Sequence, residues 1–231
     1  MTLLVVAAHP DDEVLGAGGT LAALTERGKK ARVCILSACA DARTRRPRSQ
    51  GLNEDMLRAS EILGLEEPIL GDFPNIKLNT IPHLELVQFI ENAIRNSKST
   101  TIITHHPRDL NDDHKLVSSA CQAASRLFQR SDEVTQLRAL YFMEILSSSD
   151  WSFPGTGTAI DPDTFFEIGT KGLELKIQAL NAYRGVMRPY PHPRSREVIT
   201  ALATCRGAQS RLMYAEGFQT AFRILQAGDV Q

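Results

Sequence analysis

The sequence has no excess of charge of either sign. Among its 231 residues, Lys and Arg number 26 and Asp and Glu number 27, which gives a formal net charge of −1. Nucleic-acid-binding domains usually carry an excess of basic residues, which this chain lacks. Disordered chains combine high net charge with low hydrophobicity, whereas 42% of the residues here are hydrophobic. The composition therefore predicts a globular protein that binds no nucleic acid.

Long apolar runs and paired cysteines are also lacking. The first apolar run spans only residues 3–8 and ends in polar residues. A membrane-spanning helix needs about 20 apolar residues, and a secretory signal needs a basic leader before its apolar stretch. The four cysteines form no C-x-x-C pair, and Cys34 lies within an apolar run, which favours free thiols over a disulfide framework. We therefore expect a cytoplasmic protein that does not contact a membrane.

Strand and helix patterns alternate along the first two thirds of the chain. This alternation predicts a Rossmann-like α/β fold, with a mostly parallel sheet flanked by helices. Short apolar runs predict strands at residues 3–8, 32–37, 100–104 and 138–145, and helical spacing predicts helices at 14–27, 54–63, 82–96 and 113–130. We expect one domain over residues 1–231. Its core ends near residue 146, and a C-terminal loop and helical extension follow over 147–231, with helices at 169–183 and 196–206.

Two of the predicted strands end in loops rich in His and Asp. The loop after residue 8 begins at His9 and continues into three acids, and the loop after residue 104 runs from His105 to His114. Ligands of open parallel sheets bind outside the carboxyl ends of the strands. Adjacent acids beside imidazoles repel one another unless a cation neutralises them, and this donor set suits catalytic Zn²⁺, with Fe²⁺ as an alternative. A solvated turn followed by acids at a helix N-terminus is the competing interpretation.

Glycines after the first strand raise the alternative of a dinucleotide site. Gly16, Gly18 and Gly19 follow that strand, but Leu21 stands where the third glycine of a dinucleotide fingerprint belongs. Acids also occupy the turn in which the phosphates would lie. The glycines are therefore expected to permit close packing of a helix on the sheet.

The two loops resemble the motifs of a known family, the PIG-L/LmbE-type de-N-acetylases. The first motif of that family is A-H-P-D-D-E, which this chain has at Ala8–Glu13. The second ends in a D-H pair, often within H-H-P-x-D-L-N-x-D-H, and this chain has the full pattern at His105–His114. Further similarities are Arg43, Pro191–Ser195, Arg206-Gly207 and Ala215–Phe218. The resemblance thus extends over nearly the whole chain.

This resemblance implies a Zn²⁺-dependent hydrolase that removes an N-acetyl group from an amino sugar or a sugar conjugate. It places His9, Asp12 and His114 as metal ligands and Asp11 as the general base. Some members carry a histidine where this chain has Asn111, which leaves Asn111 as a substrate-binding candidate and the proton donor unassigned. Two alternatives stay open: the same metal centre acting on another amide or an ester, and a metal-binding module without catalysis.

Several further residues are candidates for supporting roles. His105, Asp109 and Asp113 are predicted to orient the metal ligands, although the two aspartates also suit helix capping. Arg43 lies in a loop with three other arginines and could clamp an anionic part of the substrate, unless that loop is only a solvated surface. Trp151 could stack on a sugar or serve as a packing anchor.

The segment around His192 is stiffened by prolines on both sides. Because Asn111 cannot deliver a proton at neutral pH, we predict that His192 protonates the leaving amine and that Arg194 binds substrate oxygens beside it. The competing interpretation is that the prolines only stiffen a crossing loop. Glu216 is expected to be the buried partner of an arginine. The predicted partner of the protein is a small N-acetylated sugar, which can be neutral or anionic. The sequence also allows a homo-oligomer.

Overall fold

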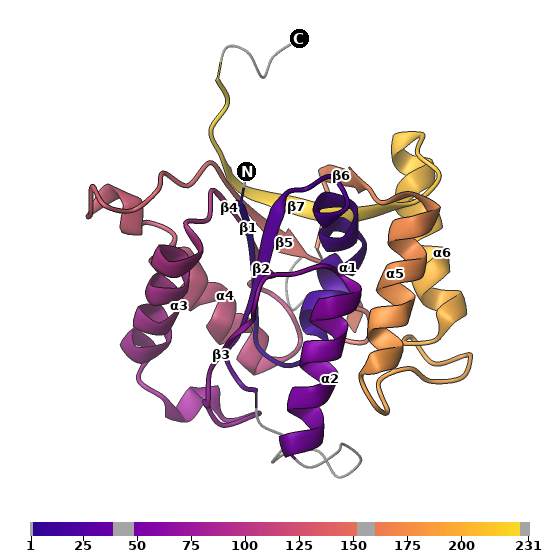
Figure 1. Ribbon diagram of the computed structural model, residues 1–231, viewed down its shortest axis with the longest axis horizontal. Helices are drawn as coiled ribbons and strands as arrows, with labels where there is room; N and C mark the ends of the chain where they lie inside the picture. The colour runs from indigo at the N-terminus through magenta and orange to yellow at the C-terminus, as the bar shows by residue number, and fades with distance from the viewer. Residues whose placement is uncertain (1, 39–48, 152–159, 227–231) are drawn as a thin grey trace.

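The structure is a computed structural model that describes residues 2–38, 49–151 and 160–226. Its centre is a seven-stranded sheet with the strand order β3-β2-β1-β4-β5-β7-β6 (Figure 1). The strands are β1 (Thr2–Ala7), β2 (Lys30–Ile35), β3 (Ile69–Leu70), β4 (Thr101–His105), β5 (Ala139–Met143), β6 (Thr164–Glu167) and β7 (Ala215–Arg223).

The N-terminal part of the sheet is parallel, as the sequence predicted. Strand β1 lies between β2 and β4 and pairs in parallel with both, and β5 pairs in parallel with β4. All residues of β1 after the first are buried, which explains why its sequence is a continuous apolar run. The carboxyl ends of β1, β4 and β5 therefore meet at the same edge of the sheet.

Helices cover both faces of the sheet. They are α1 (Asp12–Thr25), α2 (Ser49–Ile62), α3 (His83–Ser97), α4 (Asp112–Ala124), α5 (Gly169–Ala182) and α6 (Arg196–Ser210). Figure 1 shows α3 and α4 on one face and α1, α2 and α5 on the other. Successive residues of β1 enter different cores: Leu3 and Val5 pack on the side of α1, whereas Leu4 and Val6 pack on the side of α3.

The C-terminal segment differs from the predicted helical extension because it also contributes strands. Strand β7 pairs antiparallel with β5, and β6 pairs antiparallel with β7. An unpaired β5 would leave a row of open backbone groups at the edge of the sheet. The chain covers that edge with its own C-terminal segment, so residues after 160 complete the central sheet as well as adding α5 and α6.

The glycines of α1 permit close packing, as predicted. A Cβ atom on Gly16 would lie 2.4 Å from Sδ of Met143 in β5, and one on Gly19 would lie 2.7 Å from Cδ1 of Ile168, just before α5. Larger residues at these positions would push α1 away from the sheet and from α5. The glycines thus bring the helix that begins at Asp12 close to its neighbours.

Glu216 is buried beside α1, but its partner is a lysine and not the expected arginine. Lys176 of α5 donates from Nζ to Glu216 Oε1 at 2.6 Å and to the carbonyl of Leu15 at 2.8 Å. The Glu216 carboxylate also accepts hydrogen bonds from the backbone N–H groups of Gly19 and Thr20, at 2.9 and 2.8 Å. The pair therefore joins α1, α5 and β7.

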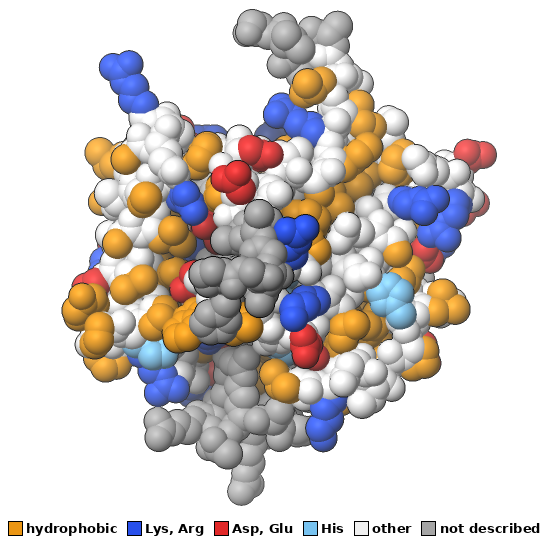
Figure 2. All heavy atoms as spheres, turned by 180° about the vertical axis from the view of Figure 1, so that it is seen from behind, with side chains coloured by type: hydrophobic (Ala, Val, Ile, Leu, Met, Phe, Trp, Pro, Cys, Tyr) orange, Lys and Arg blue, Asp and Glu red, His pale blue; other side chains and the backbone are white. Residues whose placement is uncertain are grey.

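Further observations concern the helices, the surface and the thiols. Within the described ranges, no helix has both the length and the apolar character needed to cross a membrane. The face drawn in Figure 2 carries basic, acidic and apolar side chains next to one another. Cys34 and Cys121 are buried free thiols, and burial raises the pKa of Cys121 to about 12. The thiols of Cys34 and Cys121 are thus inert and structural.

Candidate metal centre

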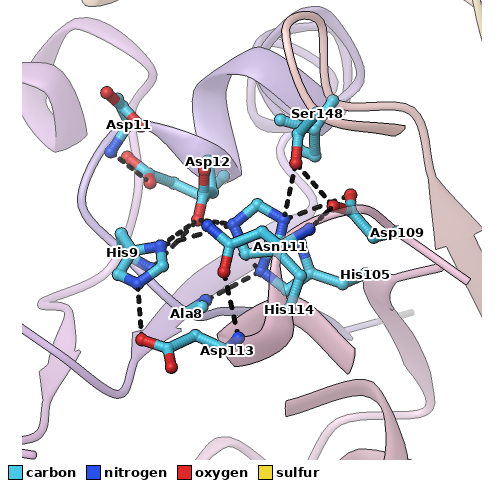
Figure 3. A network of polar contacts seen from close by, with 12 residues as sticks. Ala8, His9, Asp11, Asp12, His105, Asp109, Asn111, Asp113, His114 and Ser148 are labelled. Atoms are coloured by element: carbon cyan, nitrogen blue, oxygen red, sulfur yellow. Dashed lines mark hydrogen bonds and ion pairs between the residues drawn. The ribbon is translucent and has the colours of Figure 1, made fainter. Parts of the chain in front are cut away.

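Two strand-end loops build the site. The chain leaves β1, turns at Asp11 with a left-handed backbone (φ 98°) and starts α1 at Asp12. After β4, Asn111 caps α4 by accepting a hydrogen bond from the N–H of Asp113 at 2.9 Å. These turns direct side chains from the starts of α1 and α4 toward each other (Figure 3).

Three side-chain atoms converge at the centre of this arrangement. Oδ2 of Asp12 lies 3.2 Å from Nδ1 of His9 and 3.1 Å from Nε2 of His114, and the two nitrogens lie 3.3 Å apart. Tetrahedral ligands at about 2.1 Å from a zinc ion are about 3.4 Å from one another. The predicted ligand set is therefore brought together with separations that fit one bound divalent metal.

Carboxylates fix which ring nitrogens face the centre. His9 donates from Nε2 to Oδ2 of Asp113 at 2.9 Å, and Nδ1 of His114 lies 3.1 Å from Oδ2 of Asp109 in an ion-pair contact. In the neutral tautomers with these protons, the other nitrogen of each ring carries a lone pair. Both lone pairs then point toward the same carboxylate oxygen of Asp12. Three acceptors that face one another in a buried place repel unless a cation lies between them, so the donor set fits a metal.

The pKa values of the site also indicate that positive charge is favoured there. Asp12, His9 and His114 are all buried. Burial alone would lower the pKa of His114, but the charge of Asp12 and the hydrogen bonds to Asp109 and Asp12 raise it to about 10. Burial alone would raise the pKa of Asp12, yet the two histidines hold it well below its usual value. Without a metal, a proton on His114 supplies the positive charge where the three ligand atoms meet, and a bound cation would take its place.

His105 supports the ligands rather than joining them. Its Nε2 accepts a hydrogen bond from the N–H of Ala8 at 2.8 Å, and its ring stacks on His114 with centroids 3.9 Å apart. Burial and the charge of His114 lower the pKa of His105 to about 3, so the ring is neutral. His105, Asp109 and His114 form a second possible ligand group, in which Nε2 of His105 accepts from Ala8 while Nδ1 of His105 has no hydrogen-bond partner within the described residues.

Asp11, the predicted general base, is held by the C-terminal segment. Its Oδ2 accepts a hydrogen bond from Nη1 of Arg194 at 3.0 Å, and Nε of that arginine donates to Oγ of Ser147 at 2.8 Å. Arg194 was predicted to bind substrate oxygens, and the structure places its guanidinium on the carboxylate of Asp11. The carboxylates of Asp11 and Asp12 thus have separate partners, although the residues are adjacent.

Glu13 forms a further buried contact behind Asp11. It accepts hydrogen bonds from the N–H of Asp11 at 3.1 Å and from the hydroxyl of Tyr183 at 2.5 Å. Burial, opposed by the Tyr183 hydrogen bond and reinforced by the charge of Asp11, raises the pKa of Glu13 to about 8. The side chain of Glu13 therefore fixes the backbone at Asp11.

Sequence reasoning missed Tyr183, Ser147 and Ser148. Ser148 donates to Oδ1 of Asp109 at 2.5 Å and thereby helps to hold the carboxylate that orients His114. A signal for the serines was present, because they follow β5, whose carboxyl end lies beside that of β4. The rule for strand ends applies to β5 as well as to β1 and β4. Tyr183 follows α5 and had no comparable signal.

The other candidates have different surroundings. The side-chain oxygen of Asn111 caps α4, and Asn111 also lines a pocket beside the site. His192 is exposed, and its Nδ1 accepts a hydrogen bond from the N–H of Arg194 at 3.0 Å. Slight burial and the charges of nearby arginines lower the pKa of His192. Trp151 is half exposed, and Arg43 lies outside the described residues.

Comparison with known proteins confirms the resemblance. Residues 4–125 match the PIG-L family, described as GlcNAc-PI de-N-acetylase. The chain is 25% identical over 193 residues to "Uncharacterized deacetylase YaiS" of Escherichia coli K12, a match that covers 79% of this chain and 90% of YaiS.

Two solved structures that share the fold are named for different reactions. The 4-carboxy-2-hydroxymuconate hydratase GalB of Pseudomonas putida KT2440 superimposes with a TM-score of 0.77 at 22% identity, over 97% of this chain and 98% of GalB. The N,N'-diacetylchitobiose deacetylase of Pyrococcus horikoshii gives a TM-score of 0.71 at 16% identity, over 95% of this chain and 83% of that chain. Because a hydratase and a deacetylase share this architecture, the fold alone does not select the reaction.

Proposed function

The chain belongs to the PIG-L family, and on that premise we propose that it is a metal-dependent hydrolase that removes the acetyl group from an N-acetylated amino sugar or sugar conjugate. The observation that carries the proposal is the convergence of His9 Nδ1, Asp12 Oδ2 and His114 Nε2 within 3.1–3.3 Å of one another. The names of the family and of YaiS support a deacetylase. The chitobiose deacetylase with the same fold supports a sugar as the substrate.

The proposed ligands are His9, Asp12 and His114, and Zn²⁺ is the metal that two imidazoles and a carboxylate suit, with Fe²⁺ as the alternative. When bound, such a metal polarises an amide carbonyl and makes water more acidic. In the neutral rings that bind a metal, the protons are on the nitrogens that face Asp113 and Asp109, so the other nitrogen of each ring is the ligand atom.

Asp11 is the proposed general base. Its carboxylate takes no part in the triangle of ligand atoms, and the ion pair with Arg194 at 3.0 Å fixes its direction. In the reaction, the carboxylate accepts a proton from the attacking water. The amine then leaves with a proton, either from the protonated Asp11 or from His192, whose loop also carries Arg194. Acetate and the free amino sugar are the products.

The proposal is tested by mass spectrometry of the purified chain with a panel of N-acetylated sugars, free and nucleotide-linked. Loss of acetyl together with release of acetate is expected from at least one member of the panel. A chelator should abolish the loss, and Zn²⁺ or Fe²⁺ should restore it. A metal-loaded chain that releases acetate from no member, but hydrates an unsaturated acid, would replace the deacetylase with a hydratase of the kind that shares its fold.

A further inference from the structure

A pocket of about 380 Å³ lies against residues that orient the metal ligands. Asp113, whose carboxylate accepts the hydrogen bond from His9, belongs to its wall. Two other wall residues are apolar and half exposed, Ile76 at 50% and Leu110 at 48%. The rest of the wall is polar and consists of Asn79, Asn111, Asp112, Ser147 and Ser148.

Ile76 has a backbone conformation that isoleucine disfavours. Its φ is +60°, in the left-handed region, where a β-branched side chain is an outlier. Lys98 and Arg211 also have positive φ, but they end α3 and α6, where the left-handed region is usual. Asp11 and Ser147 share the feature and lie at the metal centre. Strained residues of this kind cluster at functional sites.

The backbone of Ile76 has a clear structural task, but its side chain does not. Its N–H donates to Oδ2 of Asp113 at 2.7 Å, and the N–H of Leu78 donates to Oδ1 at 3.1 Å. This turn holds the carboxylate that orients His9. Glycine or asparagine would supply the same N–H with less strain. Because half of the Ile76 side chain is exposed, its burial in the folded chain offsets little of the strain.

We propose that Ile76 and Leu110 form an apolar subsite that binds an apolar aglycone of the substrate, next to the sugar whose acetamide reaches the metal centre. The inference rests on the proposed deacetylase function and names the substrate class: N-acetylated amino sugars linked to an alkyl or aryl group. The polar side chains of the same wall suit the hydroxyls of the sugar, while the two apolar side chains suit the group attached to it. One pocket thus accommodates both halves of an amphipathic glycoside.

The test compares octyl and methyl N-acetylglucosaminide as substrates of the parent chain and of Ile76→Asn and Leu110→Asn. Either substitution should lower kcat/KM for the octyl glycoside about tenfold more than for the methyl glycoside, mainly through KM, as loss of apolar contact in a specificity pocket does. The matched control is Leu57→Gln, because Leu57 is 49% exposed and lies on α2 outside the pocket wall. An unchanged ratio of the two substrates in both pocket variants would overturn the subsite.

Two further readouts separate this inference from the proposed function. The melting temperature of Ile76→Asn should equal or exceed that of the parent, by up to about 4 °C, and a clear decrease would overturn the argument from strain. Octyl glucoside, which has no acetamide, should bind the parent more tightly than Ile76→Asn in calorimetry. Equal affinity of the parent and Ile76→Asn for octyl glucoside would overturn the subsite, whether or not the chain releases acetate. If the parent binds octyl glucoside more tightly but deacetylates no substrate, the subsite stands and the proposed function is wrong.

Discussion

Two buried charged clusters contact the same helix, α1, and they are built in different ways. In the middle of α1, Glu216 is neutralised by Lys176, and both oxygens of the carboxylate also accept backbone N–H groups of the helix. At the N-terminus of α1, Asp12 faces His9 and His114. Both clusters are excluded from solvent, so burial does not distinguish them.

The difference lies in the source of the positive charge. In the Lys176 cluster the chain supplies one cation for one carboxylate, which is the arrangement that a buried ion pair needs. In the other cluster, three carboxylates, those of Asp12, Asp109 and Asp113, contact two histidines, so negative charge is in excess even when both rings are protonated. The first cluster is complete without a ligand and stabilises the fold, whereas the second calls for a cation from outside.

The largest effect is expected when the second cluster loses a ligand. His114→Ala removes one of three proposed ligands, so bound metal should fall from one ion per chain to a small fraction and deacetylation should be lost. Elemental analysis of the purified variant measures the metal. His83→Ala is the matched control, because His83 is exposed at the start of α3. Full metal occupancy in His114→Ala would contradict the assignment of the ligands.

Breaking the first cluster should affect stability instead of metal. Lys176→Met leaves the buried Glu216 carboxylate without its cation, which costs about 3–5 kcal/mol of the free energy of unfolding. Chemical denaturation measures the loss, and metal content per folded chain should stay unchanged.

Two further variants make this experiment decisive. Adding Glu216→Gln to Lys176→Met should recover part of the stability, because the unpaired charge is removed. Lys171→Met is the control, since its ion pair with Glu26 is solvent-exposed and should contribute about 0–1 kcal/mol. Loss of metal in Lys176→Met at full stability would show that the two clusters are not separate in function.

Asp11→Asn sharpens the comparison within the metal cluster. The amide preserves the shape and can still accept a hydrogen bond from Arg194, but it cannot take a proton. Turnover should therefore fall at least about 100-fold, the usual contribution of a general base, while metal content stays normal. The control is Asp132→Asn, on an exposed turn far along the chain. Near-parental turnover with bound metal would assign the base to another residue.

The sequence predicted the parts of the site that follow from local motifs and strand ends. Continuous apolar runs located β1 and β4, and because parallel strands end at one edge, the loops with His9 and His114 had to meet. The glycines of α1 were interpreted correctly from the acids before them and from the position of Leu21. The short β3 and the C-terminal β6 and β7 were not predicted, since strands of two, four and nine residues without a continuous apolar run give little signal.

The contacts that hold Asp11 and its backbone could not be predicted, because they join residues far apart in the chain. Tyr183 reaches Glu13 across 170 positions, and Arg194 reaches Asp11 across 183. Neither pair has a periodicity or spacing that a single sequence reveals. For Glu216, burial and a basic partner were predicted, but the choice between lysine and arginine depended on the place of α5 beside α1.

The smallest effect is expected for His192, which tests whether the C-terminal segment only holds Asp11 or also moves a proton. Its Nδ1 accepts the N–H of Arg194 at 3.0 Å, so in the neutral ring the proton is on Nε2. Burial and the charges of Arg194 and Arg188 lower the pKa of His192 from 6.5. If the protonated ring serves the leaving amine, its contribution is lost as the pH rises through that lowered pKa.

His192→Ala should therefore lower kcat at mildly acid pH and flatten the limb along which the parent loses activity as the pH rises. General acids contribute about 100-fold or more when they are buried against the substrate. Because the His192 ring is exposed, we expect only about a tenfold decrease in kcat, with unchanged metal content. The measurement is kcat against pH at saturating substrate, beside His83→Ala. If the pH profile of His192→Ala coincides with those of the parent and of His83→Ala, Asp11 itself returns the proton to the amine. His192 then only stiffens the loop that positions Arg194.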